Sequence, residues 1–424
     1  MTSRAEKLLR SMSEDVSALQ DYLHSHNLPE LSIEEDVPFQ FQTNPNFSTR
    51  RDSAIKACRE LIALLSGSLG TLVNQTPHAI ANTQAVCKFN IASNLTEDSD
   101  VTTYNELARR CRLPETEIRR IVRALIPSHV FREYSDGRVA HTAASKLLAV
   151  DPIMREWIDL SVTEMIPAVL KFPDAMEMWP GSEEPNRTGY SLAHDTQDMA
   201  FAHMAKFPGR SERFMAAMKL FSRAPENSPR YLVENYPWAA IGRGGVIVDI
   251  GGSSGEYSIP ILQTFTNLQV IIQDLPEVIG KFDDRELPDN IKDRVSFTVH
   301  DFFTKQPVQG ADVYLLRWIL HDWSDTYAIN ILRALIPALH LKSKILINEH
   351  ILPLPGEAPV PQEMALRTFD TSMRAFTNGK EREVSDWEDL IARADNRLKI
   401  EKIETPEGSA LGIIVVGWEP SKEV

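Results

Sequence analysis

A histidine among acidic residues is the strongest chemical signal in this sequence. His321 lies in the stretch RWILHDWSD, residues 317–325, which continues an apolar run typical of a buried strand. In open α/β sheets, ligands bind beyond the carboxyl ends of the strands, so a histidine placed there can reach a substrate. Histidines also cap helices and pack in protein cores, and His321 alone does not separate these possibilities.

Two carboxylates could complete a site around this histidine. Glu349 ends the next strand-like run, ILINEHILP, and Glu381 lies in TNGKERE, a loop ahead of the helical stretch VSDWEDLIARA. A histidine base can take the proton of a hydroxyl while its oxygen attacks. A carboxylate on the other ring nitrogen fixes the tautomer and stabilises the imidazolium. These residue types suit an in-line displacement in which a hydroxyl oxygen attacks the methyl carbon of a sulfonium.

A glycine-rich turn and acidic strand ends indicate a nucleoside site. Residues 249–255, DIGGSSG, follow the first strand, Asp274 ends the second and Asp301 ends the third, just before Phe302. Glycines let a ligand approach the backbone, although the turn could also be purely structural. An acid at the second strand can bind ribose hydroxyls, which NAD and S-adenosylmethionine both carry. Acidic residues at three successive strand ends suit a nucleoside ligand that carries a positively charged sulfonium and no phosphates.

The elements that would hold these residues alternate between strands and helices. The apolar runs are GVIVDI, LQVIIQD, RVSFTVHD, ADVYLLRWIL and KILINEHIL, and helical patterns separate several of them. This pattern predicts an α/β fold with a doubly wound, Rossmann-like parallel sheet. The runs LKIEKIET and LGIIVVGWE, joined at residues 406–408, predict a C-terminal antiparallel hairpin at the sheet edge, a feature of methyltransferase sheets.

A different pattern precedes this sheet. Residues 51–75 read as a helix, and residues 101–150 read as a helix–turn–helix followed by a hairpin at Asp136-Gly137, the order of a winged helix. Thr102 or Thr103 can cap the first of its helices, and Pro114 can open the second. A winged helix can bind DNA, but the net charge of −14 favours a packing module instead.

Four regions are therefore expected along the chain. They are an N-terminal extension and linker (1–50), a helical and winged-helix domain (51–150), a helical connector (151–240) and the cofactor-binding domain (241–424). The connector is rich in Met and Phe, which can form either core or substrate pocket. The candidate substrate residues are Met199, Phe201, Met204, Met215 and Met218.

Composition narrows the function classes. An acidic chain is a poor partner for nucleic acid or an anionic membrane and fits a small-molecule ligand. The three cysteines have no disulfide or zinc spacing, so no metal site is expected and a reducing compartment is favoured. The sequence shows no signal peptide and no apolar run of about 20 residues that could span a membrane, which predicts a cytoplasmic protein.

Several of these segments resemble one enzyme family, the plant caffeate-type (class I) O-methyltransferases, in its fungal secondary-metabolism branch. The matching stretches lie within residues 245–420, and residues 100–150 match more loosely. They are VDIGGSSG, QDLPEVI, the HDFF segment, LLRWILHDWSD, ILINEHILP and NGKERE. The HDWSD match is highly specific, and the occurrence of all these stretches in the same order along the chain is more specific still.

The resemblance implies S-adenosyl-L-methionine as cofactor and a homodimer that uses the winged-helix region. It implies that His321 is the general base and that Glu349 and Glu381 orient it. The implied cofactor contacts are Gly251, Asp274, Asp301, Phe302 and Arg317, with Asp322 as a further contact to the cofactor or to the catalytic group.

This sequence departs from the family pattern at some positions, so the resemblance does not identify the substrate. Ser253 stands where many members have a third glycine, and the Met- and Phe-rich helix does not match closely. The expected substrate is a small aromatic or polyketide-like secondary metabolite with a hydroxyl group. Some fungal relatives keep the cofactor site but catalyse pericyclic or dehydration reactions. The presence of His321, Glu349 and Glu381 favours methyl transfer, and a pericyclase or cyclase is the alternative.

Overall fold

The chain forms two compact units. The computed structural model describes residues 3–33, 42, 44–73, 78–95, 101–280 and 287–419. The first unit comprises Met1–Pro167, Met204–Arg223 and Pro359–Gln362, and the second comprises Ala168–His203, Ala224–Ala358 and Glu363–Val424. The expected connector at 151–240 contributes segments to both units, and its standing as a separate domain remains a prediction.

The first unit begins with two packed helices, α1 (Arg4–Ser25) and α3 (Pro45–Val73). Helix α1 starts at a capping box in which the Ser3 side chain and the Glu6 side chain satisfy each other's backbone N–H groups. Leu19, Leu23 and Phe47 form the small buried cluster of this region. Helix α3 confirms the helix expected at 51–75 as far as Val73 and begins earlier, at Pro45, while positions 74 and 75 lie outside the described residues.

The expected helix–turn–helix and hairpin are present in the first unit. Thr103 caps α6 by accepting a hydrogen bond from the Glu106 N–H at 3.2 Å, and Pro114 precedes α7. Gly137, at φ +81°, closes the hairpin. A short strand that the sequence pattern did not reveal, β1, adds to this hairpin by pairing antiparallel with β3. The elements are α4 (His78–Lys88), α5 (Ile91–Leu95), β1 (Val101–Thr103), α6 (Tyr104–Cys111), α7 (Glu115–Leu125), β2 (Phe131–Glu133) and β3 (Arg138–His141).

Residues 143–240 are mainly helical, with turns between the helices, which confirms the expectation for 151–240. The helices are α8 (Ala143–Val150), α9 (Pro152–Leu160), α10 (Ile166–Leu170), α11 (Phe172–Met178), α12 (Gly189–Ala193), α13 (Ala200–Ala205), α14 (Pro208–Arg223) and α15 (Arg230–Asn235). A π-helical segment, Ser161–Met165, joins α9 to α10. Among the described residues, no helix is both long and apolar enough to cross a bilayer.

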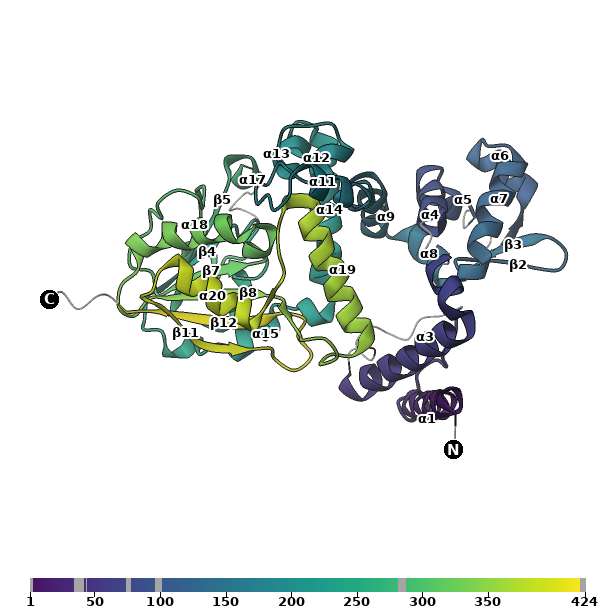
Figure 1. The fold of residues 1–424 in the computed structure, drawn as a ribbon, viewed down its shortest axis with the longest axis horizontal. Coiled ribbons are helices and arrows are strands. Elements are labelled where there is room, and N and C mark those ends of the chain that lie inside the picture. The colour runs from purple at the N-terminus through teal and green to yellow at the C-terminus, as the bar shows by residue number, and fades with distance from the viewer. Residues whose placement is uncertain are drawn as a thin grey trace. The chain divides into compact units, whose positions relative to one another are not determined.

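The second unit contains the predicted sheet, with seven strands in the order β11-β12-β8-β7-β4-β5-β6 (Figure 1). The five strands from β8 to β6 in this order are parallel, whereas β12 runs antiparallel to both of its neighbours. This arrangement confirms both the doubly wound sheet and the C-terminal hairpin. The strands are β4 (Gly245–Ile250), β5 (Leu268–Asp274), β6 (Val295–Val299), β7 (Val313–Arg317), β8 (Lys344–Glu349), β11 (Leu398–Glu404) and β12 (Gly412–Trp418).

Helices cover both faces of this sheet. Alternate residues of β7 enter different clusters: Val313 and Leu315 join one, and Tyr314 and Leu316 join the other, all without exposed surface. This alternation follows from the two-residue period of a strand. The remaining helices are α16 (Ile259–Thr264), α17 (Pro276–Ile279), α18 (Asp325–Leu335), α19 (Val360–Thr377) and α20 (Val384–Ala394). A small parallel pair, β9 (Ile351–Leu352) and β10 (Arg382–Glu383), lies beyond β8.

Candidate active site

His321 occupies a tight turn directly after β7. The chain leaves the strand through Trp318, whose φ of +50° lies in the left-handed region, and then forms one turn of 3₁₀-helix at Leu320–Asp322. A left-handed bulky residue is strained, and such strain persists only where the surroundings impose it. The turn leaves His321 only 6% exposed. The carboxyl end of β7 therefore carries the histidine where the sequence placed it.

Glu381 binds the imidazole directly. Its Oε1 lies 2.8 Å from Nδ1 of His321. Glu381 itself is 1% exposed, and its backbone N–H donates to Oδ1 of Asp370 at 2.9 Å. A carboxylate that accepts the proton on Nδ1 leaves Nε2 as the nitrogen that can take a substrate proton.

Glu349 contacts the backbone of the same turn. At the end of β8 it is completely buried, and its Oε1 accepts hydrogen bonds from the N–H groups of Ile319 at 2.8 Å and Leu320 at 2.9 Å. These contacts give Glu349 a route to orient His321 through the main chain. The orienting role expected for Glu349 remains a prediction. Glu349 contacts the backbone of the turn, whereas Glu381 contacts the imidazole ring itself.

A second histidine that the sequence analysis missed also faces Glu381. Nδ1 of His350 lies 3.4 Å from Oε2 of Glu381, an electrostatic contact at the long limit of a hydrogen bond. The ring of Phe369 packs against both imidazoles, with centroid distances of 5.8 Å to His321 and 5.3 Å to His350. The available signal was the adjacency of His350 to Glu349 in the ILINEHILP segment.

Acidic residues dominate the electrostatics around the imidazole. Burial disfavours the charged form of His321, but the carboxylates of Asp322, Glu349 and Glu381 outweigh it and raise the pKa of His321 to about 10. Oδ1 of Asp322 lies 3.8 Å from Nε2 of the ring. Burial would raise the pKa of Glu381, but the two histidines lower it to about 2. Both shifts favour the charged forms of the pair, so Glu381 stabilises the imidazolium whenever His321 is protonated.

The turn after β4 has no space for side chains at its first glycine. Gly251 has φ +67°, and a Cβ there would lie 2.5 Å from the side chain of Ile319. Ser253, the departure from the family pattern, adopts φ +50°, the conformation that glycine would favour. Gly251 is therefore required both by the left-handed conformation of the turn and by the close packing of Ile319 against it.

The predicted cofactor acids flank this turn. Asp274 accepts hydrogen bonds from the N–H groups of Ser253 at 3.0 Å and of Leu275 at 2.8 Å, and each of its oxygens retains a lone pair for a ribose hydroxyl. Asp301 is exposed, and its Oδ1 accepts the N–H of Phe303 at 2.9 Å. The ring of Phe302 packs at 5.0 Å from that of Phe303. Carboxylates and aromatic rings fit the ribose and adenine of a nucleoside.

Arg317 is largely occupied by protein partners. Its guanidinium donates to the Asn348 side chain and to the Asn227 carbonyl, the latter at 2.8 Å, and lies 3.7 Å from the centre of the Tyr257 ring. Burial lowers the pKa of this arginine. Its proposed contact with a cofactor remains a prediction.

The five candidate substrate residues are divided between the units. Met199 packs against the larger core cluster of the sheet, and the ring of Phe201 lies 5.9 Å from that of Phe376, all within the second unit. Met204, Met215 and Met218 belong to the first unit, where Met204 is buried and the other two are partly buried. Their role in a substrate pocket remains a prediction.

Comparison with known proteins adds independent information. Residues 186–396 match a family model described as an O-methyltransferase domain. An O-methyltransferase of the grayanic acid biosynthesis cluster of Cladonia grayi is 37% identical over 99% of this chain and 89% of its own length. Among solved structures, OxaC in complex with SAH and oxaline has a TM-score of 0.78 at 22% identity, with 97% of this chain and 99% of that chain covered. A structure titled "A Pericyclic Reaction enzyme" has a TM-score of 0.75 at 23% identity, with 97% and 100% covered.

We expect Gly251→Ala to weaken cofactor binding. The new Cβ would meet Ile319 and would force a left-handed alanine, which costs about 1–2 kcal/mol. Gly356→Ala is the matched control, because Gly356 has φ +85° but nothing within 4 Å of an added Cβ. Calorimetric titration with S-adenosylmethionine should show a larger Kd only for Gly251→Ala. Equal affinities of the two variants would contradict this placement of the cofactor.

Proposed function

Because this chain belongs to the plant-type O-methyltransferase family, among the enzymes of fungal secondary metabolism, we propose that it methylates a phenolic hydroxyl with His321 as general base. It is an S-adenosylmethionine-dependent O-methyltransferase. The proposed substrate is a small aromatic or polyketide-like molecule. The observation that carries the proposal is the buried bond of 2.8 Å between Nδ1 of His321 and Glu381.

The cofactor supplies an electrophilic methyl carbon on a sulfonium, and the protein supplies a base and a position. Nε2 of His321 takes the hydroxyl proton as the oxygen attacks, while Glu381 stabilises the imidazolium that forms. Gly251, Asp274, Asp301 and Phe302 would hold the cofactor. General-base catalysis of this kind contributes roughly 10²–10⁴-fold.

The acidity of the base supports a phenol rather than an aliphatic alcohol. A phenol has a pKa of about 10, and the three nearby carboxylates raise the pKa of His321 to about 10. A raised pKa makes His321 a stronger base and lowers the cost of taking a proton from a phenol. An aliphatic hydroxyl is a much weaker acid and would give this histidine an uphill transfer.

The alternative function is a pericyclic or cyclising reaction without methyl transfer. Its support is the fold shared with the pericyclic reaction enzyme at 23% identity, which concerns architecture alone. The contact between Nδ1 of His321 and Glu381 favours methyl transfer, because it leaves Nε2 as a proton acceptor that a pericyclic step does not need.

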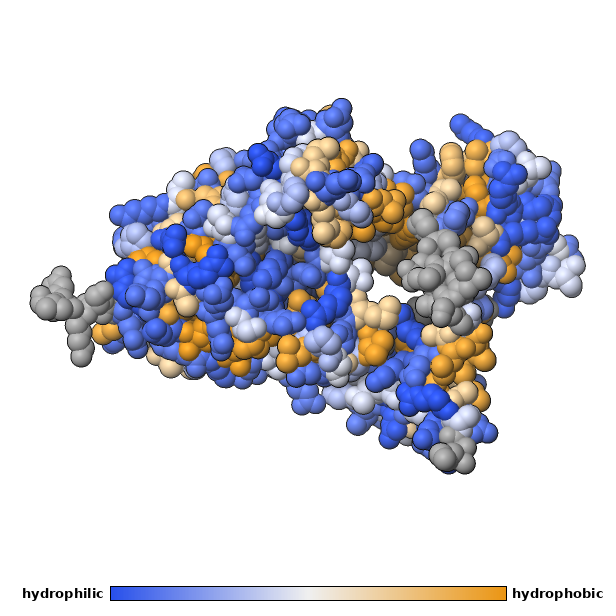
Figure 2. Space-filling view, in the orientation of Figure 1, coloured by the Kyte–Doolittle hydropathy of each residue, from blue (hydrophilic) through white to orange (hydrophobic). Residues whose placement is uncertain are grey.

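We also propose a homodimer in the cytoplasm. Helix α3 exposes three large aliphatic side chains, Ile62 (62%), Leu64 (51%) and Leu65 (78%), and Figure 2 shows apolar surface over this helix. Clustered exposed apolar residues on a stable protein commonly mark an interface. Cysteines without paired spacing favour a reducing compartment.

We expect His321→Gln to abolish methyl transfer while the cofactor still binds. Glutamine keeps a polar side chain but cannot accept the hydroxyl proton, so the rate should fall roughly 10²–10⁴-fold. Phenolic polyketide-like compounds would be incubated with methyl-labelled S-adenosylmethionine and analysed by mass spectrometry for labelled product. A wild-type product of unchanged mass, without S-adenosylhomocysteine, would support the pericyclic alternative.

The rate should rise with pH into the alkaline range. Only neutral imidazole is a base, and a raised pKa of about 10 means that the neutral fraction grows until the pH passes that value. Glu381→Gln removes a negative charge and should move the midpoint of kcat/KM to lower pH, because the imidazolium loses its partner. The control is Glu401→Gln, a remote carboxylate on β11. A midpoint that is the same in Glu381→Gln and wild type would contradict this assignment.

The proposed dimer predicts a change of mass on substitution of α3. The wild type should have the mass of two chains by light scattering, and Ile62→Lys with Leu65→Lys should give monomers, because charges on an apolar interface oppose its burial. Leu170→Lys, at a residue 67% exposed in the second unit, is the control and should stay dimeric. A monomeric wild type would refute the dimer.

A further inference from the structure

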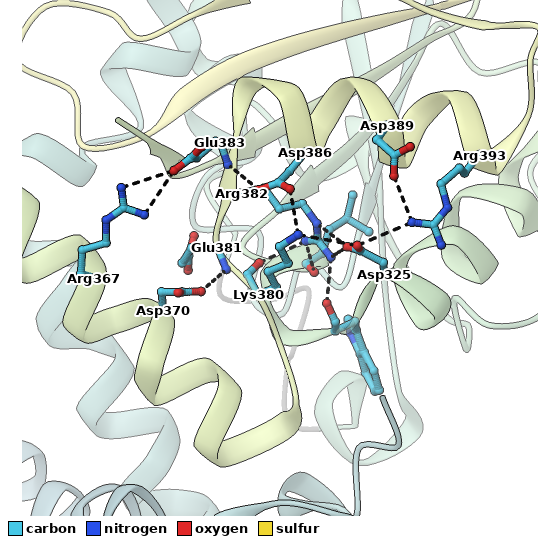
Figure 3. Close-up of polar contacts among 12 residues, drawn as sticks. Asp325, Arg367, Asp370, Lys380, Glu381, Arg382, Glu383, Asp386, Asp389 and Arg393 are labelled. Atoms are coloured by element: carbon cyan, nitrogen blue, oxygen red, sulfur yellow. Dashed lines mark hydrogen bonds and ion pairs between the residues drawn. The ribbon is translucent and has the colours of Figure 1, made fainter. Parts of the chain in front are cut away.

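Arg382, next to Glu381, is a completely buried cation. The exposed fraction of the whole residue is 0%. Figure 3 shows its side chain leaving the loop in a different direction from that of Glu381. A buried charge is costly unless it is paired and hydrogen-bonded, so the partners of Arg382 indicate what it does.

Those partners are carbonyl groups on both sides of the catalytic histidine. Nη1 of Arg382 donates to the carbonyl of Leu320 at 3.0 Å, and Nη2 donates to the carbonyl of Trp323 at 3.0 Å. Leu320 and Trp323 bracket His321 and Asp322 in the sequence. The planar guanidinium therefore fastens the two ends of the turn that carries the base.

The charge of Arg382 is balanced at the start of α18. Nε and Nη2 donate to Oδ1 of Asp325 at 3.0 and 2.9 Å, and the guanidinium carbon lies 5.2 Å from the centre of the Trp387 ring. Asp325 also attracts Lys380 and Arg393 from the protein surface (Figure 3). Arg382 is thus held in one orientation before any ligand binds.

Three consecutive residues of this loop each contact the same turn. The Lys380 N–H donates to the His321 carbonyl at 2.9 Å, Glu381 contacts the imidazole, and Arg382 contacts the flanking carbonyls. A Cβ on Gly379 would lie 2.2 Å from the His321 carbonyl oxygen, so the loop approaches the turn as closely as glycine permits. Ring and backbone of the histidine are therefore held by one short segment.

We propose that Arg382 is a positioning residue that fixes the 320–323 turn, and with it the imidazole of His321, against Glu381. This proposal rests on His321 being the base. A displacement of about 1 Å at a reacting group can cost roughly 10²-fold in rate. Without the guanidinium, the two carbonyls lose the donor that they share, only the Trp323 N–H remains on the Leu320 carbonyl, and the turn can shift away from the loop.

The test compares Arg382→Met, Arg382→Lys and the control Arg393→Met, which removes another cation near Asp325 without touching the turn. We expect Arg382→Met to lower kcat about 10²-fold with an unchanged Kd for S-adenosylmethionine. Its kcat/KM midpoint should move to lower pH, because the imidazolium loses contact with Glu381. Lysine keeps the charge but cannot reach both carbonyls, so Arg382→Lys should lie between Arg382→Met and wild type.

Several outcomes would overturn the proposal. A loss of rate that matches only the loss of folded protein, with an unchanged pH midpoint, would make Arg382 merely structural. Equal losses of kcat in Arg393→Met and Arg382→Met would also show that Arg382 has no specific positioning role. If Arg382→Met does not fold, a wild-type pH midpoint in Arg382→Lys decides against positioning. An inactive His321→Gln beside a fully active Arg382→Met would refute this inference alone, whereas an active His321→Gln would refute the proposed base.

Discussion

The bond between Nδ1 of His321 and Oε1 of Glu381 is the interaction on which the site depends. It joins residues 60 apart in the chain, one after β7 and one before β10. Both side chains are almost completely buried, so water cannot replace a missing partner, and loss of either would leave an unpaired charge in the interior. Much of the surrounding structure serves to hold these two segments together: Glu349 and Arg382 bind the backbone of one, and Asp370 binds the backbone of the other.

The same acidic residues would act electrostatically on both the proposed base and the cofactor. Asp322, Glu349 and Glu381 raise the proton affinity of His321, and a site with this excess of negative charge also attracts a cationic ligand. A sulfonium fits such a site better than a pyrophosphate would. The proposed proton acceptance by His321 and the binding of a positively charged methyl donor would thus have one electrostatic origin.

Most of the fold and the residue types of the site could be predicted from the sequence, because the geometry of a parallel sheet determines where its strands end. Parallel strands end at the same edge of a sheet, so His321, Glu349 and Asp274 could be brought together from strand patterns alone. The roles of His350 and Arg382 were missed, because both contacts depend on how a short loop folds back on a turn. Hydrophobic periodicity carries no information about such loops. The methionines show the same limit, since composition could not assign them to one compact unit or the other.

The position of β12 has a consequence for biosynthesis. It is the last strand in chain order, yet it lies inside the sheet, between β8 and β11, and its Gly412 is paired with Glu349. A nascent polypeptide emerging from the ribosome therefore exposes an open edge at β8 until β12 has been translated. Unpaired strand edges are sites of misassociation. Glu349 is thus enclosed only after β12 has been made, and a chain translated only as far as β8 would have neither a closed sheet nor a covered Glu349.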